Sequence, residues 1–141
     1  MLRRSSFLLP AGVAIAIVGF LAPSAEAGSA HFVGTPTASA SGDTLTVKGK
    51  EAGLGNLTQI NVLVTADAQC VNKGGNEPSA DNKDSFGSDV DVPVQNGKAN
   101  FTVVLTADLQ PDCTKSMKLV WSNVTITDTT NDLTVTLPGT F

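Results

Sequence analysis

The stretch TQINVLVTADAQC, residues 58–70, is the part of the chain from which the fold is first predicted. Its small and apolar side chains all occupy even positions: Ile60, Val62, Val64, Ala66, Ala68 and Cys70. Side chains alternate between the two faces of a β-strand, so this parity predicts a strand with one buried face. It also places Cys70 on that buried face.

The chain has only one other cysteine, Cys113, which closes a 43-residue interval. The first 27 residues read as an export signal: Arg3 and Arg4 are followed by an apolar run and by the small-x-small sequence Ala25-Glu26-Ala27. The apolar run is short for a membrane-spanning helix, which needs about 20 residues. An exported protein enters an oxidising compartment, so we expect Cys70 and Cys113 to form a disulfide that ties two strands of the domain.

Residues 28–141 suit a single domain. They contain seven lysines, no arginine and twelve acidic residues, which gives a net charge near −5. An acidic chain without a basic cluster argues against nucleic acids and anionic membranes as partners. We expect no membrane span after signal cleavage, and a location outside the cytoplasm, either secreted or in the cell envelope.

The remaining segments also alternate in the way strands do. Leu45 and Val47 form one run, and Glu51 to Asn56 reads as a connection. The other runs have apolar side chains at Val90, Val92 and Val94; at Phe101, Val103, Leu105, Ala107 and Leu109; at Met117, Leu119 and Trp121; and at Leu133, Val135 and Leu137.

Three local signals add to this pattern. Pro93 suggests that the run at 90–94 is an edge strand. Gln95-Asn96-Gly97-Lys98 predicts a hairpin between that strand and the next, because Asn-Gly favours tight hairpin turns. The parity then changes near Ser122-Asn123, from Trp121 to Val124, which predicts a β-bulge or a strand that passes between sheets.

About seven short strands, with no amphipathic helix, predict an all-β fold: an immunoglobulin-like antiparallel β-sandwich, with a small barrel as the alternative. We expect Trp121 in the core beside the disulfide. In immunoglobulin domains, however, the core Trp lies between the two cysteines in sequence, whereas Trp121 follows both.

Several motifs together resemble a group of small exported bacterial proteins, mainly actinobacterial. They are HFVGTP (31–36), EAGLGN (51–56), AQCVNKGGNEP (68–78), QNGK (95–98), PDC (111–113) and MKLVW (117–121). The resemblance covers nearly all of residues 28–141 and implies no catalytic residues. In shape alone the chain also looks like the apoproteins of the neocarzinostatin family, exported immunoglobulin-like domains that hold a small apolar ligand. Those domains normally have two disulfides, and this chain can form one.

Residues for catalysis or for a metal centre are scarce. His31 is the only histidine and lies in the lead-in segment, where we expect it to pack beside Phe32. A Ser-His-acid triad would depend on it. Zinc sites favour several Cys and His ligands, which one histidine and two bridged cysteines do not supply. We expect no enzyme activity and no cofactor.

Calcium is the one metal with candidate ligands, because it accepts oxygen donors from loops. Asp81, Asp84 and Asp89 lie in or beside the Asn- and Asp-rich interval 71–87, but their order does not match that of an EF-hand loop. We therefore favour a role in turns, in which Asn and Asp side chains bond the nearby backbone.

The interval from Val71 to Gly87 reads as a long loop, and loops of this length are often functional. Its candidate contact residues are Asn72, Lys73, Asn76, Asn82, Lys83 and Phe86. We expect a non-enzymatic extracellular binding module that uses this loop to contact a protein or a glycan. The alternatives are a small-ligand carrier like the neocarzinostatin apoproteins and a structural envelope protein whose edge strands associate.

Overall fold

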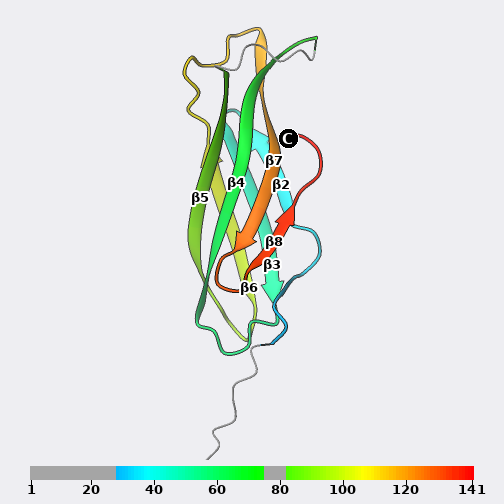
Figure 1. Cartoon of the computed structure of the whole chain (residues 1–141), viewed down its shortest axis with the longest axis vertical. Coiled ribbons are helices and arrows are strands. Elements are labelled where there is room, and N and C mark those ends of the chain that lie inside the picture. Colours follow the sequence, from blue (N-terminus) through cyan, green and yellow to red (C-terminus); the bar gives the residue numbers. More distant parts are fainter. Residues whose placement is uncertain (1–27, 75–81) are drawn as a thin grey trace, which may run out of the picture.

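A computed structural model describes residues 28–74 and 82–141, which form an elongated sandwich of two antiparallel sheets (Figure 1). The first sheet contains β1 (His31–Phe32), β2 (Thr37–Ser41), β3 (Thr44–Ala52) and β6 (Ala99–Thr106). The second contains β4 (Gln59–Asn72), β5 (Lys83–Pro93), β7 (Met117–Asp128) and β8 (Leu133–Thr136). The all-β sandwich is therefore confirmed, and no helix of the described residues is long and apolar enough to cross a membrane.

In the first sheet β3 is central. β1 and β2 pair with successive parts of one edge of β3, and β6 pairs with the other edge. The second sheet has the order β5-β4-β7-β8. These pairings are those of an immunoglobulin-like Greek key, in which β2, β3 and β6 correspond to strands A, B and E, and β8, β7, β4 and β5 to G, F, C and C′.

The core lies between the sheets, where the predicted parity of 58–70 is confirmed. All six even-numbered side chains from Ile60 to Cys70 are almost fully buried. Leu45, Val47, Phe101, Val103 and Leu105 face them from the first sheet. Trp121 is fully buried and packs edge-on against Phe86, with ring centroids 5.7 Å apart.

The predicted bulge in β7 is also confirmed. Thr65 pairs with Thr125 and Asp67 pairs with Ser122, so Asn123 and Val124 together face one residue of β4. Asn123 adopts a positive φ of 51°, and Val124 is fully buried. β7 stays within one sheet, and the extra residue restores the inward direction of its apolar side chains.

Three predictions about the strands are wrong. Gln95 to Lys98 forms a turn, with hydrogen bonds between Gln95 and Lys98, but β5 and β6 diverge from it into different sheets instead of pairing. β6 ends at Thr106, so Ala107 and Leu109 lie beyond it. Glu51, which is predicted to lie in a connection, belongs to β3 and is buried in the core.

The disulfide between Cys70 and Cys113 is confirmed, with Cα atoms 5.4 Å apart. It does not join two strands. Cys70 lies near the end of β4, and Cys113 lies in the segment between β6 and β7. The bridge therefore fastens that segment to one end of the sandwich, which we call the disulfide-bridged end.

Candidate functional site

The expected binding loop is shorter than predicted. β4 extends through Asn72 and β5 begins at Lys83, so residues 71–72 and 83–87 of the interval belong to a strand pair. Polar outward-facing residues and Gly87 made the first half of β5 resemble a loop. Its pairing runs from Gln69↔Lys83 to Gln59↔Pro93, and it is the edge strand that Pro93 suggested.

The candidate contact residues do not form one surface. Asn72 and Lys73 lie at the end of β4, where the Asn72 side-chain oxygen accepts a hydrogen bond from the Gly74 N–H at 3.1 Å. Asn76 lies outside the described residues. Lys83 begins β5, next to Asn82, and Phe86 points inward to Trp121. Phe86 is therefore a packing residue and offers no aromatic platform to a glycan.

The calcium candidates are not brought together either. Asp84 and Asp89 differ in parity and so lie on opposite faces of β5. Asp89 instead accepts a hydrogen bond from the Asn61 side-chain amide at 3.1 Å. Asp81 lies outside the described residues. In the described part of the chain, no three His, Cys, Asp or Glu side chains are grouped so that they could hold a metal ion.

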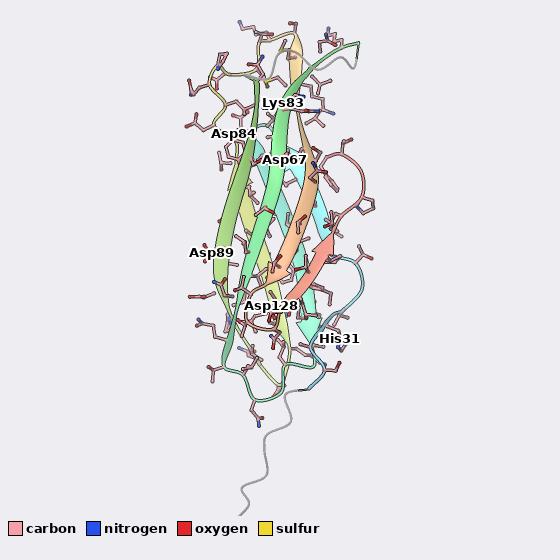
Figure 2. All side chains as sticks on the ribbon, in the orientation of Figure 1. His31, Asp67, Lys83, Asp84, Asp89 and Asp128 are labelled. Atoms are coloured by element: carbon pink, nitrogen blue, oxygen red, sulfur yellow. A yellow bond between two sulfur atoms is a disulfide. The ribbon has the colours of Figure 1, made fainter. Side chains whose placement is uncertain are left out.

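His31 is exposed, and its Nδ1 lies 2.7 Å from the Ser29 carbonyl oxygen. Its neighbour Phe32 packs edge-on against Phe101 instead, with ring centroids 6.3 Å apart. In Figure 2, His31 and Asp128 lie in the lower half of the sandwich, away from Asp84 and Lys83 at the upper end. His31 is thus part of the lead-in strand.

A different feature forms the candidate site: a pocket between the sheets at the disulfide-bridged end. β8 pairs only with the last part of β7, from Thr125 to Asp128. Further along β7, Phe141 exchanges two backbone hydrogen bonds with Trp121, at 3.0 and 2.9 Å. The first residues of β7 have no backbone-paired neighbour on that side among the described residues, which leaves room for a pocket beside them.

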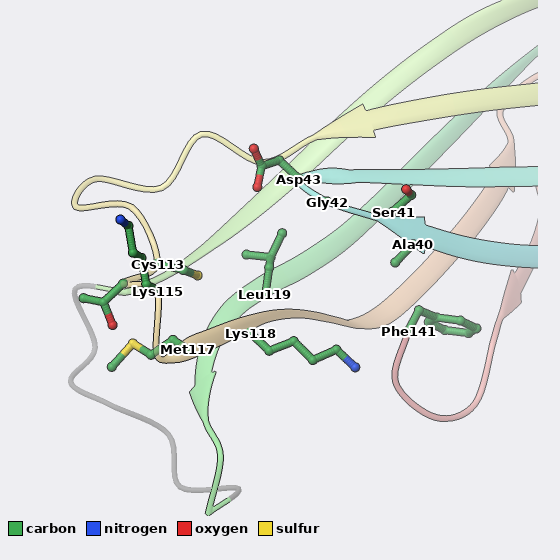
Figure 3. A pocket seen from close by; sticks show the side chains of 11 residues that line it. Ala40, Ser41, Gly42, Asp43, Cys113, Lys115, Met117, Lys118, Leu119 and Phe141 are labelled. Atoms are coloured by element: carbon green, nitrogen blue, oxygen red, sulfur yellow. The ribbon is translucent and has the colours of Figure 1, made fainter.

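We call this cavity of about 480 Å³ the disulfide pocket. One wall is the end of β2 with its turn, and the other is the start of β7 with the segment before it (Figure 3). It is lined by Ala40, Ser41, Gly42, Asp43, Cys113, Thr114, Lys115, Met117, Lys118, Leu119 and Phe141. A smaller hollow of about 260 Å³ adjoins it and shares Asp43, Cys113 and Leu119.

The chemistry of the disulfide pocket combines apolar and charged groups. Leu119, Met117 and Phe141 supply apolar surface, while Lys115, Lys118 and Asp43 supply charge. No carboxylate of the described residues forms an ion pair with Lys115 or Lys118. Both lysines also line a third hollow of about 340 Å³ on the other side of β7, beside Lys73. The start of β7 and the segment just before it therefore lie between two hollows, and Lys115 and Lys118 line both of them.

One further pair of acidic residues is notable but is closed to solvent. Glu51 and Asp128 are fully buried. The pKa of Glu51 is raised to about 8. Burial is the main cause, and a side-chain hydrogen bond with Asp128 and the negative charge of Asp128 add to it. Neither residue lines the three cavities described above, so we assign the pair to the core.

The disulfide pocket is not predicted from the sequence, although one signal points to it. The polar segment Thr114-Lys115-Ser116 stands between a bridged cysteine and the apolar residues Met117 and Leu119. This pattern is typical of a surface segment held against the core. Nothing in the sequence indicates that Ala40 and Phe141 line the pocket, because only the strand pairing brings them to this end.

Comparisons with protein-family models, with curated proteins and with solved structures gave no match to this chain, so its function is argued from the site alone.

Proposed function

We propose that this protein is an exported, non-enzymatic binding module whose contact region is the disulfide-bridged end. The observation that supports this proposal is the disulfide pocket. Its volume of about 480 Å³ is in the range of ligand sites, which measure roughly 300–1,000 Å³. The disulfide agrees with an oxidising compartment outside the cytoplasm.

The lining of the pocket indicates the chemistry of its partner. Leu119 and Phe141 would contact an apolar group. The ammonium groups of Lys115 and Lys118, which form no ion pair with the described residues, would attract an anionic group. The partner should therefore carry an apolar group next to a carboxylate, sulfate or phosphate. The described residues of the predicted loop do not line this pocket. Asn72 and Lys73 line only the neighbouring hollow on the other side of β7.

A small-ligand carrier is the second candidate, and the same cavity volume favours it. The two candidates differ in the partner's size. A carrier would enclose a whole ligand, whereas a binding module would accept one group of a larger molecule. The lining residue Ala40 is exposed, so the pocket is accessible from solvent, which favours the binding module.

A binding survey with residues 28–141 tests the proposal. Isothermal calorimetry would compare octanoate, octyl sulfate and acidic peptides with neutral partners of the same shape, namely octanol and the matching amidated peptides. We expect the anionic member of each pair to bind more tightly.

Lys118→Gln should weaken binding about tenfold, which corresponds to one charge-assisted hydrogen bond. Lys48→Gln is the matched control, because Lys48 is an exposed lysine on the outer face of β3. Equal binding of charged and neutral partners, or equal loss in both variants, would contradict the proposal.

A further inference from the structure

The edge strand β2 is open on the side that faces away from β3. It pairs with β3 from Thr37↔Lys48 to Ser41↔Thr44, and no other described segment hydrogen-bonds to it through the backbone. Its sequence, Thr-Ala-Ser-Ala-Ser, contains no charge and no proline. Charged residues and proline usually protect an edge strand against pairing with another chain. The other edge strand, β5, has this protection in Asp89, Asp91 and Pro93.

The hairpin geometry shows which backbone groups of β2 point outward. Gly42 and Asp43 form a two-residue turn, with a φ of 56° at Gly42, so the flanking pair Ser41↔Thr44 is hydrogen-bonded. Hydrogen-bonded and non-hydrogen-bonded pairs alternate along an antiparallel ladder. The N–H and C=O groups of Ala38 and Ala40 therefore face the open edge.

The side chains of these two alanines point between the sheets, each into a cavity. Ala40 lines the disulfide pocket and is exposed, although its partner Leu45 is fully buried. Ala38 lines a cavity of about 270 Å³ formed with Pro36, Leu137 and Pro138, which we call the proline hollow. Phe141 lines both cavities and lies between them along the strand.

A strand added beside β2 would fit both features. Its residues opposite Ala38 and Ala40 would bond to the outward backbone groups, and their side chains would enter the two cavities. The proline hollow is mainly apolar and suits a leucine-sized side chain. The disulfide pocket combines apolar surface with Lys115 and Lys118, which outnumber its one acid, Asp43, and which form no ion pair with the described residues. This lining suits the stem and carboxylate of a glutamate.

We propose that β2 binds an extended polypeptide segment as an additional antiparallel strand, with an acidic residue in the disulfide pocket and an apolar residue two positions later in the proline hollow. The acidic residue comes first because β2 runs toward the disulfide-bridged end and the added strand runs the opposite way. This inference rests on the proposed function and specifies the partner as a polypeptide that carries the pattern acidic-x-apolar.

A second copy of the chain is a poorer occupant of this edge. In antiparallel β2–β2 pairing, Ala38 of one copy would lie opposite Ala40 of the other. Only methyl groups would then face cavities of about 480 and 270 Å³, which would stay largely unfilled. Two copies of Lys118 would also lack an anionic partner.

The test uses residues 28–141 and the peptide acetyl-Thr-Glu-Thr-Leu-Thr-amide, with binding followed by calorimetry. Methylation of the glutamate or leucine backbone nitrogen should weaken binding about tenfold or more, because those N–H groups face β2. Methylation of the central threonine nitrogen should have little effect, because that N–H faces solvent. Equal effects of all three methylations would overturn the proposal.

Two protein variants provide an independent test. Ala40→Pro removes an outward N–H but no bond to β3, and proline is tolerated on edge strands. It should weaken binding about tenfold. Ala40→Ser keeps the N–H and should weaken binding less than Ala40→Pro does. Lys118→Gln should weaken binding of the glutamate peptide and leave the affinity for its glutamine analogue unchanged.

The outcomes separate this inference from the proposed function. If octanoate binds in a Lys118-dependent way but the methylation pattern is absent, the pocket is functional and the strand-addition proposal is wrong. If the chain alone is a dimer that Ala40→Pro makes monomeric, a second copy occupies the edge and the proposal is again wrong. If neither octanoate nor the peptide binds, the proposed function falls as well.

Discussion

Glu51 on β3 and Asp128 on β7 face each other between the two sheets, and both side chains are fully buried. The hydrogen bonds divide unequally between them. Asp128 accepts bonds from the Thr130 N–H at 2.8 Å, the Asn131 N–H at 3.3 Å and the Asn131 side-chain amide at 2.6 Å. The Glu51 carboxyl oxygens accept none. A protonated Glu51 that donates to Asp128 satisfies both groups, which agrees with the raised pKa of Glu51.

This pair predicts that the fold loses stability as pH rises. The pKa of Glu51 rises from 4.5 to about 8 on folding, so between these values the folded chain holds a proton that the unfolded chain has released. The contribution is complete below about pH 4.5 and falls by roughly 1.4 kcal/mol per pH unit until about pH 8. Glu51→Gln should remove this slope and stabilise the protein at pH 8. Urea unfolding at several pH values measures both effects.

The control for the pH prediction is Asp132→Asn, which makes the same change of charge at an exposed position. It should leave the slope between pH 5 and 8 in place. A native chain whose stability does not decline over this range would show that Glu51 is ionised in the folded state.

Gly49 predicts a second effect, because its missing side chain makes room for an aromatic ring. A Cβ atom at Gly49 would collide with the ring of Phe101, which pairs with it across β3 and β6. Gly49→Ala should therefore cost about 1–3 kcal/mol, the usual penalty for overpacking a core. Gly87→Ala is the control, because a Cβ there makes only ordinary contacts, with the Thr65 methyl at 3.5 Å and the Val64 carbonyl oxygen at 3.7 Å. Equal stability of the two variants would contradict this account.

The disulfide predicts a third effect, on the free energy of unfolding. Closing a loop of 43 residues stabilises a fold by about 4 kcal/mol in the chain-entropy description. The Cys70→Ala/Cys113→Ala double variant should lose about that amount in urea unfolding. Cys70→Ala also leaves a cavity, which lowers stability by itself. Unfolding of the native protein in a reductant is the control, because it breaks the bridge without making this cavity. A loss below about 1 kcal/mol in both would mean that the bridge constrains the unfolded chain little.

The bulge in β7 predicts a fourth effect, on backbone strain. Asn123 has a φ of 51°, and its side chain donates to Asp67 at 2.7 Å. Asn123→Gly and Asn123→Ala both lose this bond, but only alanine is strained at positive φ. Asn123→Ala should therefore be less stable than Asn123→Gly by about 1 kcal/mol. At Thr127, in regular strand, the same two substitutions should rank in the opposite order.

The parity of residues 58–70 predicted the central strand, its buried face and its cysteine, because side-chain alternation is a local property of the backbone. The change of parity at Asn123 predicted the bulge for the same reason. The predicted pairing of Cys70 with Cys113 depended on the export signal and needed no geometry. These predictions succeed because each depends on a few neighbouring residues.

The predictions that failed depend on pairing between distant segments. Asn96-Gly97 makes a tight turn, but whether its flanking strands pair is decided by β3 and β4, which bind β6 and β5 more extensively. Lys83 to Gly87 has loop-like composition and becomes a strand because β4 is long enough to pair with it. Glu51 is buried because β3 continues there between β1 and β6, and no local pattern indicates that its side chain meets Asp128. The disulfide pocket depends in the same way on where β8 ends.

The central position of β3 in its sheet also bears on how fast the molecule assembles. β3 pairs with β6 from Thr44↔Thr106 to Glu51↔Ala99, so the paired residues are separated by 48 to 62 positions in the sequence. Folds dominated by such distant contacts form in milliseconds to seconds, whereas helical domains of similar stability form in microseconds to milliseconds. A newly made chain of this kind therefore spends a comparatively long time with unpaired strands.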